Sequence, residues 1–180
     1  MCIRDRVITR PLAQAGALAQ RVTAIGRKAV VFPLLEILPL DDQEALRAAL
    51  RELDRYALIA FVSPNAIDAA FAARPDWPWH IPLAVVGEGS RMALLRHGAS
   101  KANATIVSPT DLERTDSETL LAELDLPALR GKQVLIIRGE TGRELLGDTL
   151  RAAGIGVTPL AAYRRVAPEW NSARPVSYTH

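Results

Sequence analysis

The sequence has 180 residues, of which 23% are charged and 49% are hydrophobic, and its formal net charge is +2. This composition is ordinary for a globular protein of one large domain or two small ones. Because Cys2 is the only cysteine, a disulfide framework is excluded. No apolar run approaches the roughly 18 residues of a membrane span, the start lacks a secretory signal pattern, and no dense basic block favours nucleic acid. We therefore expect a cytoplasmic protein that binds neither membrane nor nucleic acid.

Short apolar runs typical of strands alternate with helical periods along the whole chain. Strands are predicted over residues 7–10, 29–40, 57–63, 83–87, 104–109, 133–139 and 156–165. Pro33 and Pro39 break the second run and favour an exposed, extended connector in its later part. Strands that alternate with helices indicate βαβ units and a parallel sheet, so the predicted fold class is α/β.

Helices are predicted between most of these strands from apolar residues at helical spacing. Their markers are, in chain order, Leu18 and Val22; Leu46 and Leu50; Ile67 and Phe71; residues 90–97; Leu120 and Leu124; and Leu146 and Leu150. Gly26, Gly98 and Gly154 are placed to end three of these helices. Thr115 and Glu118 have the spacing of a capping box at the start of another.

Residues 39–160 contain enough alternating elements for a complete α/β domain, whereas residues 7–38 supply one βα unit and one further strand. A fragment of that size cannot bury a core alone and needs a partner. The extended segments 33–40 and 158–166 flank the complete domain, and we expect them to pair as two antiparallel connectors that leave and re-enter a first, incomplete domain. The remaining assignments are a return connector over 161–175 and, because they match no element, non-native ends over 1–6 and 176–180.

Four loops that follow predicted strands carry glycine or small hydroxyl residues and lead into helices. They span residues 9–11, 63–65, 87–90 and 138–144. Because the carboxyl ends of parallel strands meet at one edge of a sheet, we expect all four loops at the same edge. Helix N-termini with unpaired N–H groups, together with nearby glycines, form a cradle for anions.

Each loop also has a purely structural interpretation. Ser63 and Ser90 are good helix N-caps, and Arg138 and Arg143 can be solvated surface charges. Residues 87–89 match part of a nucleotide-binding fingerprint, but the third glycine is missing at the expected spacing.

Conventional catalytic sets are missing from the sequence. No Cys, His and Asp spacing favours a metal site, no nucleophile elbow is present, and His97 is interpreted as structural because it lies near a helix C-terminus. Tyr163 differs, because it is predicted in an extended connector between domains, beside Arg164 and Arg165. Its phenol can donate a hydrogen bond or a proton into an interdomain cleft, or it can be a packing tyrosine with a satisfied hydroxyl.

Several segments carry a resemblance to a known family: VITRP, FPLLEI, FVSPNAIDA, AVVGEGSRMALLRHG, DSETLL and GKQVLIIRGETGRELLGDTLRAAGIGVTPLAAYRR. In this order, from Val7 to about Trp170, they resemble uroporphyrinogen-III synthase of the bacterial type, and the last segment is the most specific. The resemblance implies two flavodoxin-like parallel-sheet domains joined by a two-stranded linker, with the substrate in the cleft between them. It also implies a C-terminal truncation, because the family's chain continues after the returning connector and completes the first domain.

The resemblance further implies a hydro-lyase of haem and tetrapyrrole biosynthesis. That family cyclises hydroxymethylbilane to uroporphyrinogen III with inversion of ring D and loss of water, without cofactor or metal. By motif matching, Tyr163 is expected to assist departure of the hydroxyl group. The residues expected to bind the substrate are Arg10, Pro11, Ser63, Asn65, Gly87, Ser90, Arg138, Gly139, Glu140, Gly142 and Arg143. We expect a monomer and, because one wall of the cleft would be absent, little or no activity from these 180 residues.

An alternative interpretation belongs to another class of protein. A non-catalytic, two-lobed α/β module that binds a small acidic ligand would share this fold, because a fold does not by itself define a function. A complementary half-domain downstream would favour the enzyme, whereas a DNA-binding or signalling domain would favour the module.

Overall fold

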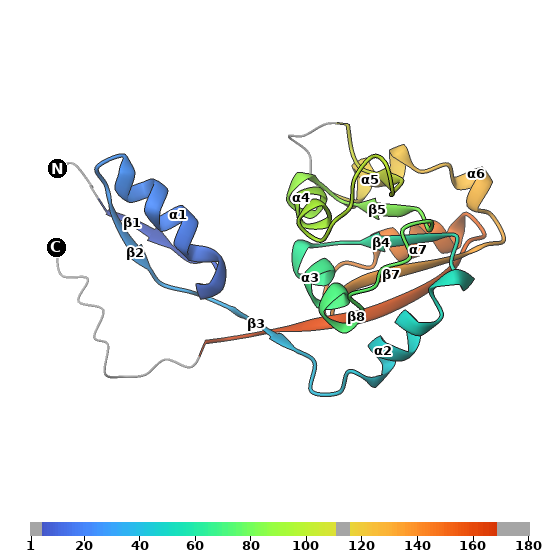
Figure 1. Ribbon diagram of the computed structural model, residues 1–180, viewed down its shortest axis with the longest axis horizontal. Helices are drawn as coiled ribbons and strands as arrows, with labels where there is room; N and C mark the ends of the chain where they lie inside the picture. Colours follow the sequence, from blue (N-terminus) through green and yellow to red (C-terminus); the bar gives the residue numbers. More distant parts are fainter. Residues whose placement is uncertain (1–4, 111–115, 169–180) are drawn as a thin grey trace. The chain divides into compact units, whose positions relative to one another are not determined.

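The computed structural model describes residues 5–110 and 116–168 (Figure 1). These residues form two compact units. Unit 1 contains the described residues up to Leu38 and those from Arg165 onward, and unit 2 is Pro39–Arg164. Both boundaries fall within strands, so the chain passes between the units in extended conformation.

Unit 1 contains one βαβ arrangement. Strand β1 (Asp5–Ile8), helix α1 (Leu12–Ala24) and strand β2 (Lys28–Val31) follow one another, and the two strands pair in parallel. The predicted helix is confirmed. It ends just before Gly26, whose φ of 71° lies in the left-handed region that glycine tolerates best. Strand β1 begins at Asp5 and not at Val7 as the sequence predicts.

Unit 2 is built on a larger sheet. The strands of this sheet are β3 (Glu36–Pro39), β4 (Leu58–Phe61), β5 (Leu83–Val85), β6 (Ile106–Val107), β7 (Gln133–Gly139) and β8 (Gly156–Val166). They lie in the order β3-β8-β7-β4-β5-β6, and every pair from β8 to β6 is parallel. The parallel α/β sheet predicted from the alternating pattern is confirmed. Strand β8, the long orange-red arrow in Figure 1, pairs with the whole of β7, so residues 158–166 are an integral part of the sheet rather than a connector alone.

Helices cover both faces of this sheet. They are α2 (Glu44–Arg51), α3 (Pro64–Ala73), α4 (Glu88–Arg96), α5 (Ser117–Glu123), α6 (Leu126–Leu129) and α7 (Leu145–Ala152). Helices α5 and α7 pack on one face, where Leu146 joins a cluster with Ala60 of β4. The next residue of β4, Phe61, points to the opposite face because side chains alternate along a strand. There it contacts Trp77, which stacks on Phe71 of α3, and α2 and α4 both contact α3.

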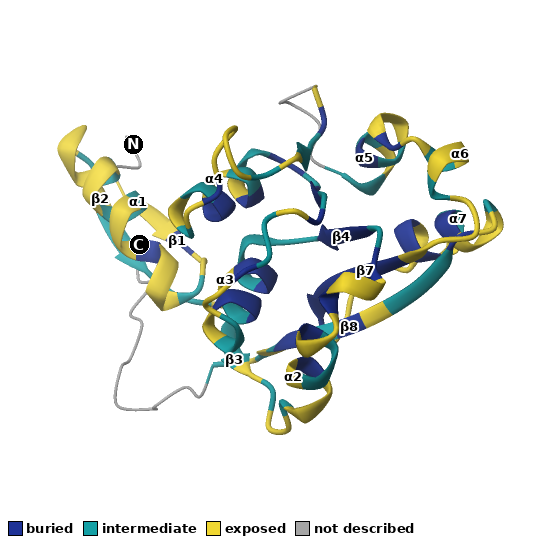
Figure 2. Ribbon diagram, turned by 45° about the vertical axis from the view of Figure 1, so that its right-hand side comes forward, coloured by how far each residue is buried: buried dark blue, intermediate teal, exposed yellow. Residues whose placement is uncertain are grey.

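The two central strands, β4 and β7, form the middle of the core. All four side chains of β4 are at most 3% exposed, and six of the seven residues of β7 are buried. Figure 2 shows both strands in the colour of buried residues. A parallel strand covered by helices on both faces must be apolar along its whole length, which explains the unbroken LIAF and VLII runs. Each large side chain buried there contributes about 1.5–3 kcal/mol to folding.

The N-cap predictions have different outcomes. Ser63 caps α3 as predicted, because its Oγ accepts a hydrogen bond from the Ala66 N–H at 3.2 Å. The N-cap interpretation of Ser90 is wrong. Helix α4 begins directly after Gly87, so Ser90 lies within its first turn, and only 3% of Ser90 is exposed.

Two further local features differ from the sequence analysis: a predicted capping box and a short helix that was not predicted. Thr115 of the predicted capping box lies outside the described residues, and the box that the structure shows joins Asp116 and Thr119. The short helix α6 has no apolar period long enough to predict it. Among the described residues, none of the helices combines the length and apolar character needed to span a bilayer.

Candidate functional site

The larger sheet reverses its winding between β4 and β7. From β4 the chain continues to β5 and then β6 on one side, whereas β7 is followed by β8 on the other side. The helix after β4, α3, and the helix after β7, α7, cover opposite faces. The two loops therefore diverge at the carboxyl ends of neighbouring strands, and doubly wound sheets bind ligands at such switch points.

Two hydroxyl groups meet at this switch point. The Ser63 Oγ, in the loop after β4, lies 3.1 Å from the Tyr163 hydroxyl oxygen on β8, although the two residues are 100 positions apart in the chain. Tyr163 is 1% exposed and Ser63 is partly buried, so Ser63 is the more accessible member of the pair. Ser63 thus has two partners, the Ala66 N–H at the start of α3 and the phenol of Tyr163.

The donor direction decides which proton this pair can offer. When Tyr163 donates to Ser63, the Ser63 oxygen accepts two hydrogen bonds, one of them from the Ala66 N–H, and its own O–H stays free to donate to a ligand. When Ser63 donates, its proton is used within the pair. The arrangement can therefore present a neutral hydroxyl donor from the start of α3.

At the end of β7, the charge of Arg138 is paired with a carboxylate of the loop that follows. The Arg138 Nη1 donates to the Glu144 carboxylate at 2.6 Å, and the Arg138 side chain is 11% exposed. Gly142 passes close by, since a Cβ on it would lie 3.2 Å from the Arg138 Nη2. Arg143, in contrast, is exposed. The positive charge that this loop can offer to an anion is therefore that of Arg143.

The loop after β5 leads into α4 through Gly87, the N-cap residue. Glu88 and Arg91 form two hydrogen bonds of 2.7 Å in the first turn of this helix. The hydrogen bonds from Arg91 lower the pKa of the Glu88 carboxyl from its ordinary value; desolvation opposes this effect, and the attraction of the Arg91 charge adds to it. A Cβ on Gly89 would lie 3.7 Å from the Pro64 Cγ, so the first turns of α3 and α4 are in contact.

The structure brings only part of the predicted set together. Asn65 lies in the first turn of α3, and Glu140 directly follows the end of β7 and is exposed. The loop with Arg10 and Pro11 follows β1, which belongs to the separate two-stranded sheet. The expectation that all four loops share one edge of one sheet is therefore wrong, because the chain builds two sheets and only three of the loops follow strands of the larger one.

Sequence reasoning missed the acidic partners of this edge. Glu88 and Arg91 stand three positions apart on a helix, a spacing that favours ion pairs, so this pair had a readable signal. Glu144 is six positions from Arg138 across an irregular loop, and no period indicates such a contact. Within the part of the chain that the structure describes, no group of three or more His, Cys, Asp or Glu side chains is placed to bind a metal ion.

Fold and site together define a doubly wound α/β protein that gathers hydroxyl groups and helix N-termini at the switch point of a parallel sheet. Residues 16–175 match the family model described as uroporphyrinogen-III synthase HemD, and the chain belongs to this enzyme family. It is 33% identical over 176 residues to the uroporphyrinogen-III synthase of Salmonella typhimurium, covering 97% of this chain and 70% of that protein. It is 34% identical to that of Escherichia coli, covering 93% and 67%.

Solved structures of the family share the fold. A mutant uroporphyrinogen III synthase of the extremely thermophilic bacterium Thermus thermophilus superposes with a TM-score of 0.62 at 16% identity, over 93% of this chain and 64% of that one. The Helicobacter pylori 26695 enzyme superposes with a TM-score of 0.58 at 16% identity, over 94% and 65%. The chain thus spans about two thirds of the length of the relatives that it matches.

Proposed function

We propose that this chain forms the larger part of a uroporphyrinogen-III synthase, which cyclises hydroxymethylbilane to uroporphyrinogen III with inversion of ring D and loss of water. The observation that carries the proposal is the Ser63–Tyr163 hydroxyl pair at the switch point, in a chain that belongs to this family. The non-catalytic binding module is not favoured, because the curated relatives are named as synthases.

The substrate's chemistry fits the charge at this edge. Hydroxymethylbilane carries acetate and propionate arms, and carboxylates are stabilised near helix N-termini. Helices α3 and α4 begin side by side there, and Arg143 adds an exposed positive charge. The partial positive charges at the starts of these two helices and one exposed guanidinium can therefore attract carboxylates without a cofactor or a metal.

Positioning is the main catalytic task in this proposal. Loss of the hydroxyl group from hydroxymethylbilane gives a reactive azafulvene that cyclises unaided to the wrong isomer, so the enzyme must hold the ring D end where attack occurs at the substituted carbon. The hydroxyl pair supplies the acid that helps the leaving group depart. Because Tyr163 is buried, its proton reaches the substrate by way of the partly buried Ser63, or after local opening around Tyr163.

The domain organisation belongs to the same proposal. Residues 39–160 form one flavodoxin-like domain, and residues 7–38 with the return segment 161–175 form part of a second, joined to the first by a two-stranded linker. Support comes from the small sheet of unit 1, since two strands and one helix make a marginal core. A cytoplasmic monomer without cofactor completes the proposal.

A chimera tests the proposed activity, because the 180 residues alone are expected to turn over little hydroxymethylbilane. We would replace the segment of the Salmonella typhimurium relative that corresponds to Pro39–Arg164 with this chain's residues and identify the product isomer by chromatography. The chimera is expected to yield uroporphyrinogen III. A folded chimera that yields only the isomer formed without enzyme would contradict the proposed activity. Robust turnover by the 180 residues alone would contradict only the expectation that a wall of the cleft is missing.

Tyr163→Phe in this chimera tests the role of the phenol. Turnover is expected to fall about 10²-fold, with product binding unchanged, because the substitution removes the acid but keeps the ring. The control is Tyr56→Phe, which also removes a hydroxyl from a buried tyrosine of unit 2 but should leave turnover unchanged. Equal turnover of the two variants would leave Tyr163 as a packing residue.

A further inference from the structure

The backbone conformation of Gly139, the last residue of β7, does not require a glycine. Gly139 is buried, and its φ lies outside the positive range that disfavours other residues. A turn or a left-handed backbone therefore does not explain why this position lacks a side chain. Another explanation must come from the atoms around it.

The atoms nearest to the missing side chain all belong to Tyr163. A Cβ on Gly139 would lie 3.0 Å from the Tyr163 Cζ, 3.1 Å from its Cε2 and 3.2 Å from its hydroxyl oxygen. Carbon atoms in contact are normally about 3.5–4.0 Å apart, so a methyl group would overlap the ring. The hydroxyl end of the tyrosine ring thus occupies the space that a side chain at position 139 would fill.

The backbone brings the ring to this place through an irregular pairing. In the parallel register Arg138 pairs with Ala161, but Gly139 pairs with Tyr163, so β8 contains one extra residue, Ala162. Such a bulge turns the side chain that follows it. The Glu140 N–H donates to the Tyr163 carbonyl at 2.8 Å and holds the two strands together beyond the irregularity.

We propose that Gly139 is a positioning residue that seats the Tyr163 phenol against the β7 backbone and so places its hydroxyl on Ser63. This assigns Gly139 to the support of the tyrosine and not to direct contact with substrate. The geometric part stands on the contacts alone, whereas its consequence for turnover rests on the proposed function. A methyl group at position 139 would push the ring away from Ser63 and separate the two hydroxyl groups.

Chemical labelling of the 180-residue chain tests whether Gly139 positions the Tyr163 ring, and it does not require an active enzyme. Tyr56 and Tyr163 are both buried in unit 2, at 5% and 1% exposed. We would nitrate the folded wild type and the Gly139→Ala variant with tetranitromethane and quantify each tyrosine by peptide mass spectrometry. Nitration of Tyr163 is expected to rise about tenfold in the variant while Tyr56 stays protected. Unchanged protection of Tyr163 would overturn the proposal, and so would a parallel rise at both residues.

Two controls test whether Gly139→Ala acts through a general loss of stability: the same substitution at another glycine, and Gly139→Ala in a background without the Tyr163 ring. Gly89→Ala places a Cβ at an ordinary 3.7 Å from Pro64 and should change neither nitration nor the melting temperature by much. Gly139→Ala should lower the melting temperature clearly in the wild type but little in a Tyr163→Val background, where the ring is absent. An equal drop in both backgrounds would refute the proposal that Gly139 makes room for the Tyr163 ring.

The two proposals fail separately. If Tyr163 becomes reactive in Gly139→Ala but the chimera makes no uroporphyrinogen III, the positioning role of Gly139 is supported and the proposed function is refuted. If the chimera is active and Gly139→Ala leaves both nitration and turnover unchanged, the proposed function is supported and the positioning role of Gly139 is refuted.

Discussion

Two close contacts at the carboxyl edge of the larger sheet differ in what stabilises them. The Ser63–Tyr163 pair joins two hydroxyl groups, one of them on a tyrosine that is 1% exposed, so bulk water replaces this hydrogen bond poorly when it breaks. The Glu88–Arg91 pair joins charges on side chains that are 39% and 40% exposed. Water and salt screen such a pair, and its contribution to stability is small.

The Glu88–Arg91 pair predicts a pH dependence. The pKa of Glu88 is lower in the folded chain than its ordinary value of 4.5, so the carboxylate favours folding above that value and the contribution is lost as pH falls through the folded pKa. We expect Glu88→Gln to lower the melting temperature slightly at neutral pH, and the difference from wild type to disappear once the pH has fallen below the folded pKa of Glu88.

The partner substitution is the control for this pH effect. In an Arg91→Gln background, Glu88→Gln should have a smaller effect at neutral pH, because only the favourable position of Glu88 at the start of α4 remains to be lost. A difference between wild type and Glu88→Gln that grows toward acid pH would contradict the assignment.

Some local roles were predictable from the sequence, although the N-cap interpretation failed at Ser90, whereas contacts with distant partners were not predictable. Ser63 as the cap of α3 follows from the next three residues, because capping is decided within one helical turn. Its contact with Tyr163 spans 100 positions and depends on the order of strands. Arg138 looked free to bind a carboxylate, and its pairing with Glu144 depends on the path of a loop that carries no period.

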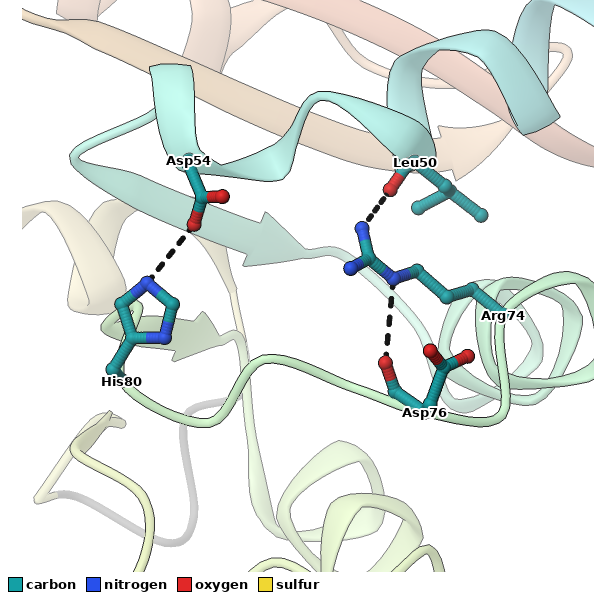
Figure 3. Close-up of polar contacts among 5 residues, drawn as sticks. All are labelled: Leu50, Asp54, Arg74, Asp76 and His80. Carbon is teal, nitrogen blue, oxygen red and sulfur yellow. Dashed lines mark hydrogen bonds and ion pairs between the residues drawn. The ribbon is translucent and has the colours of Figure 1, made fainter.

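At the scale of elements, Arg74 ties the ends of two helices together. Figure 3 shows its guanidinium reaching the Leu50 carbonyl at the end of α2 and the Asp76 carbonyl, which its Nε contacts at 3.3 Å. Carbonyls in the last turn of a helix lack partners within the helix, so the side chain satisfies an otherwise unpaired group. The residues around this contact, with Arg47 and Arg51, line an open hollow of about 340 Å³.

Arg74→Met should destabilise the chain by about 1–2 kcal/mol, because it keeps the aliphatic stem and removes the donors for the Leu50 carbonyl. Urea unfolding followed by circular dichroism measures the change. Arg47→Met is the matched control, since Arg47 lines the same hollow but is exposed and should change stability by less than about 0.5 kcal/mol. Equal effects of the two substitutions would show that Arg74 does not tie the helices.

The elements themselves were predicted best where an uninterrupted apolar run lies between clear turn signals. Residues 133–139 form β7 with both predicted ends, because an apolar run buried on both faces is unambiguous between turn signals. The run 29–40 splits into β2 and β3 around Pro33, which cannot donate to a sheet ladder, whereas Pro39 is the last residue of β3. The irregular pairing of β8 with β7 left no trace in either strand's sequence, because it arises from fitting the two strands together.

At the scale of the whole molecule, most of the exposed large apolar side chains among the described residues lie in unit 1, and the other two, Met92 and Leu145, lie in unit 2. Val7, Leu12, Ile25 and Leu34 are 48%, 68%, 73% and 56% exposed, and all of them belong to unit 1. The larger sheet of unit 2 is covered on both faces by helices, whereas unit 1 has two strands and one helix. Unit 1 therefore buries much less apolar surface per residue.

Hydrogen exchange should reveal this difference between the units. Amides of β4 and β7 are expected to exchange only through global unfolding, and amides of β1 and β2 at least about 100-fold faster, because a two-stranded sheet is marginal alone. Exchange followed by peptide mass spectrometry reports both sets in one sample. Equal protection in the two sheets would show that unit 1 is as stable as unit 2 without further chain.

The sequence by itself determined the alternation of strands and helices, the parallel sheet and the resemblance to the family, because each is written in short-range periods and local motifs. Only the tertiary structure decided that the loop after β1 lies on a different sheet from the other three, that Tyr163 is a buried partner of Ser63, and that Gly139 makes room for its ring. These outcomes depend on strand order and register, which are fixed when segments far apart in the chain pack together.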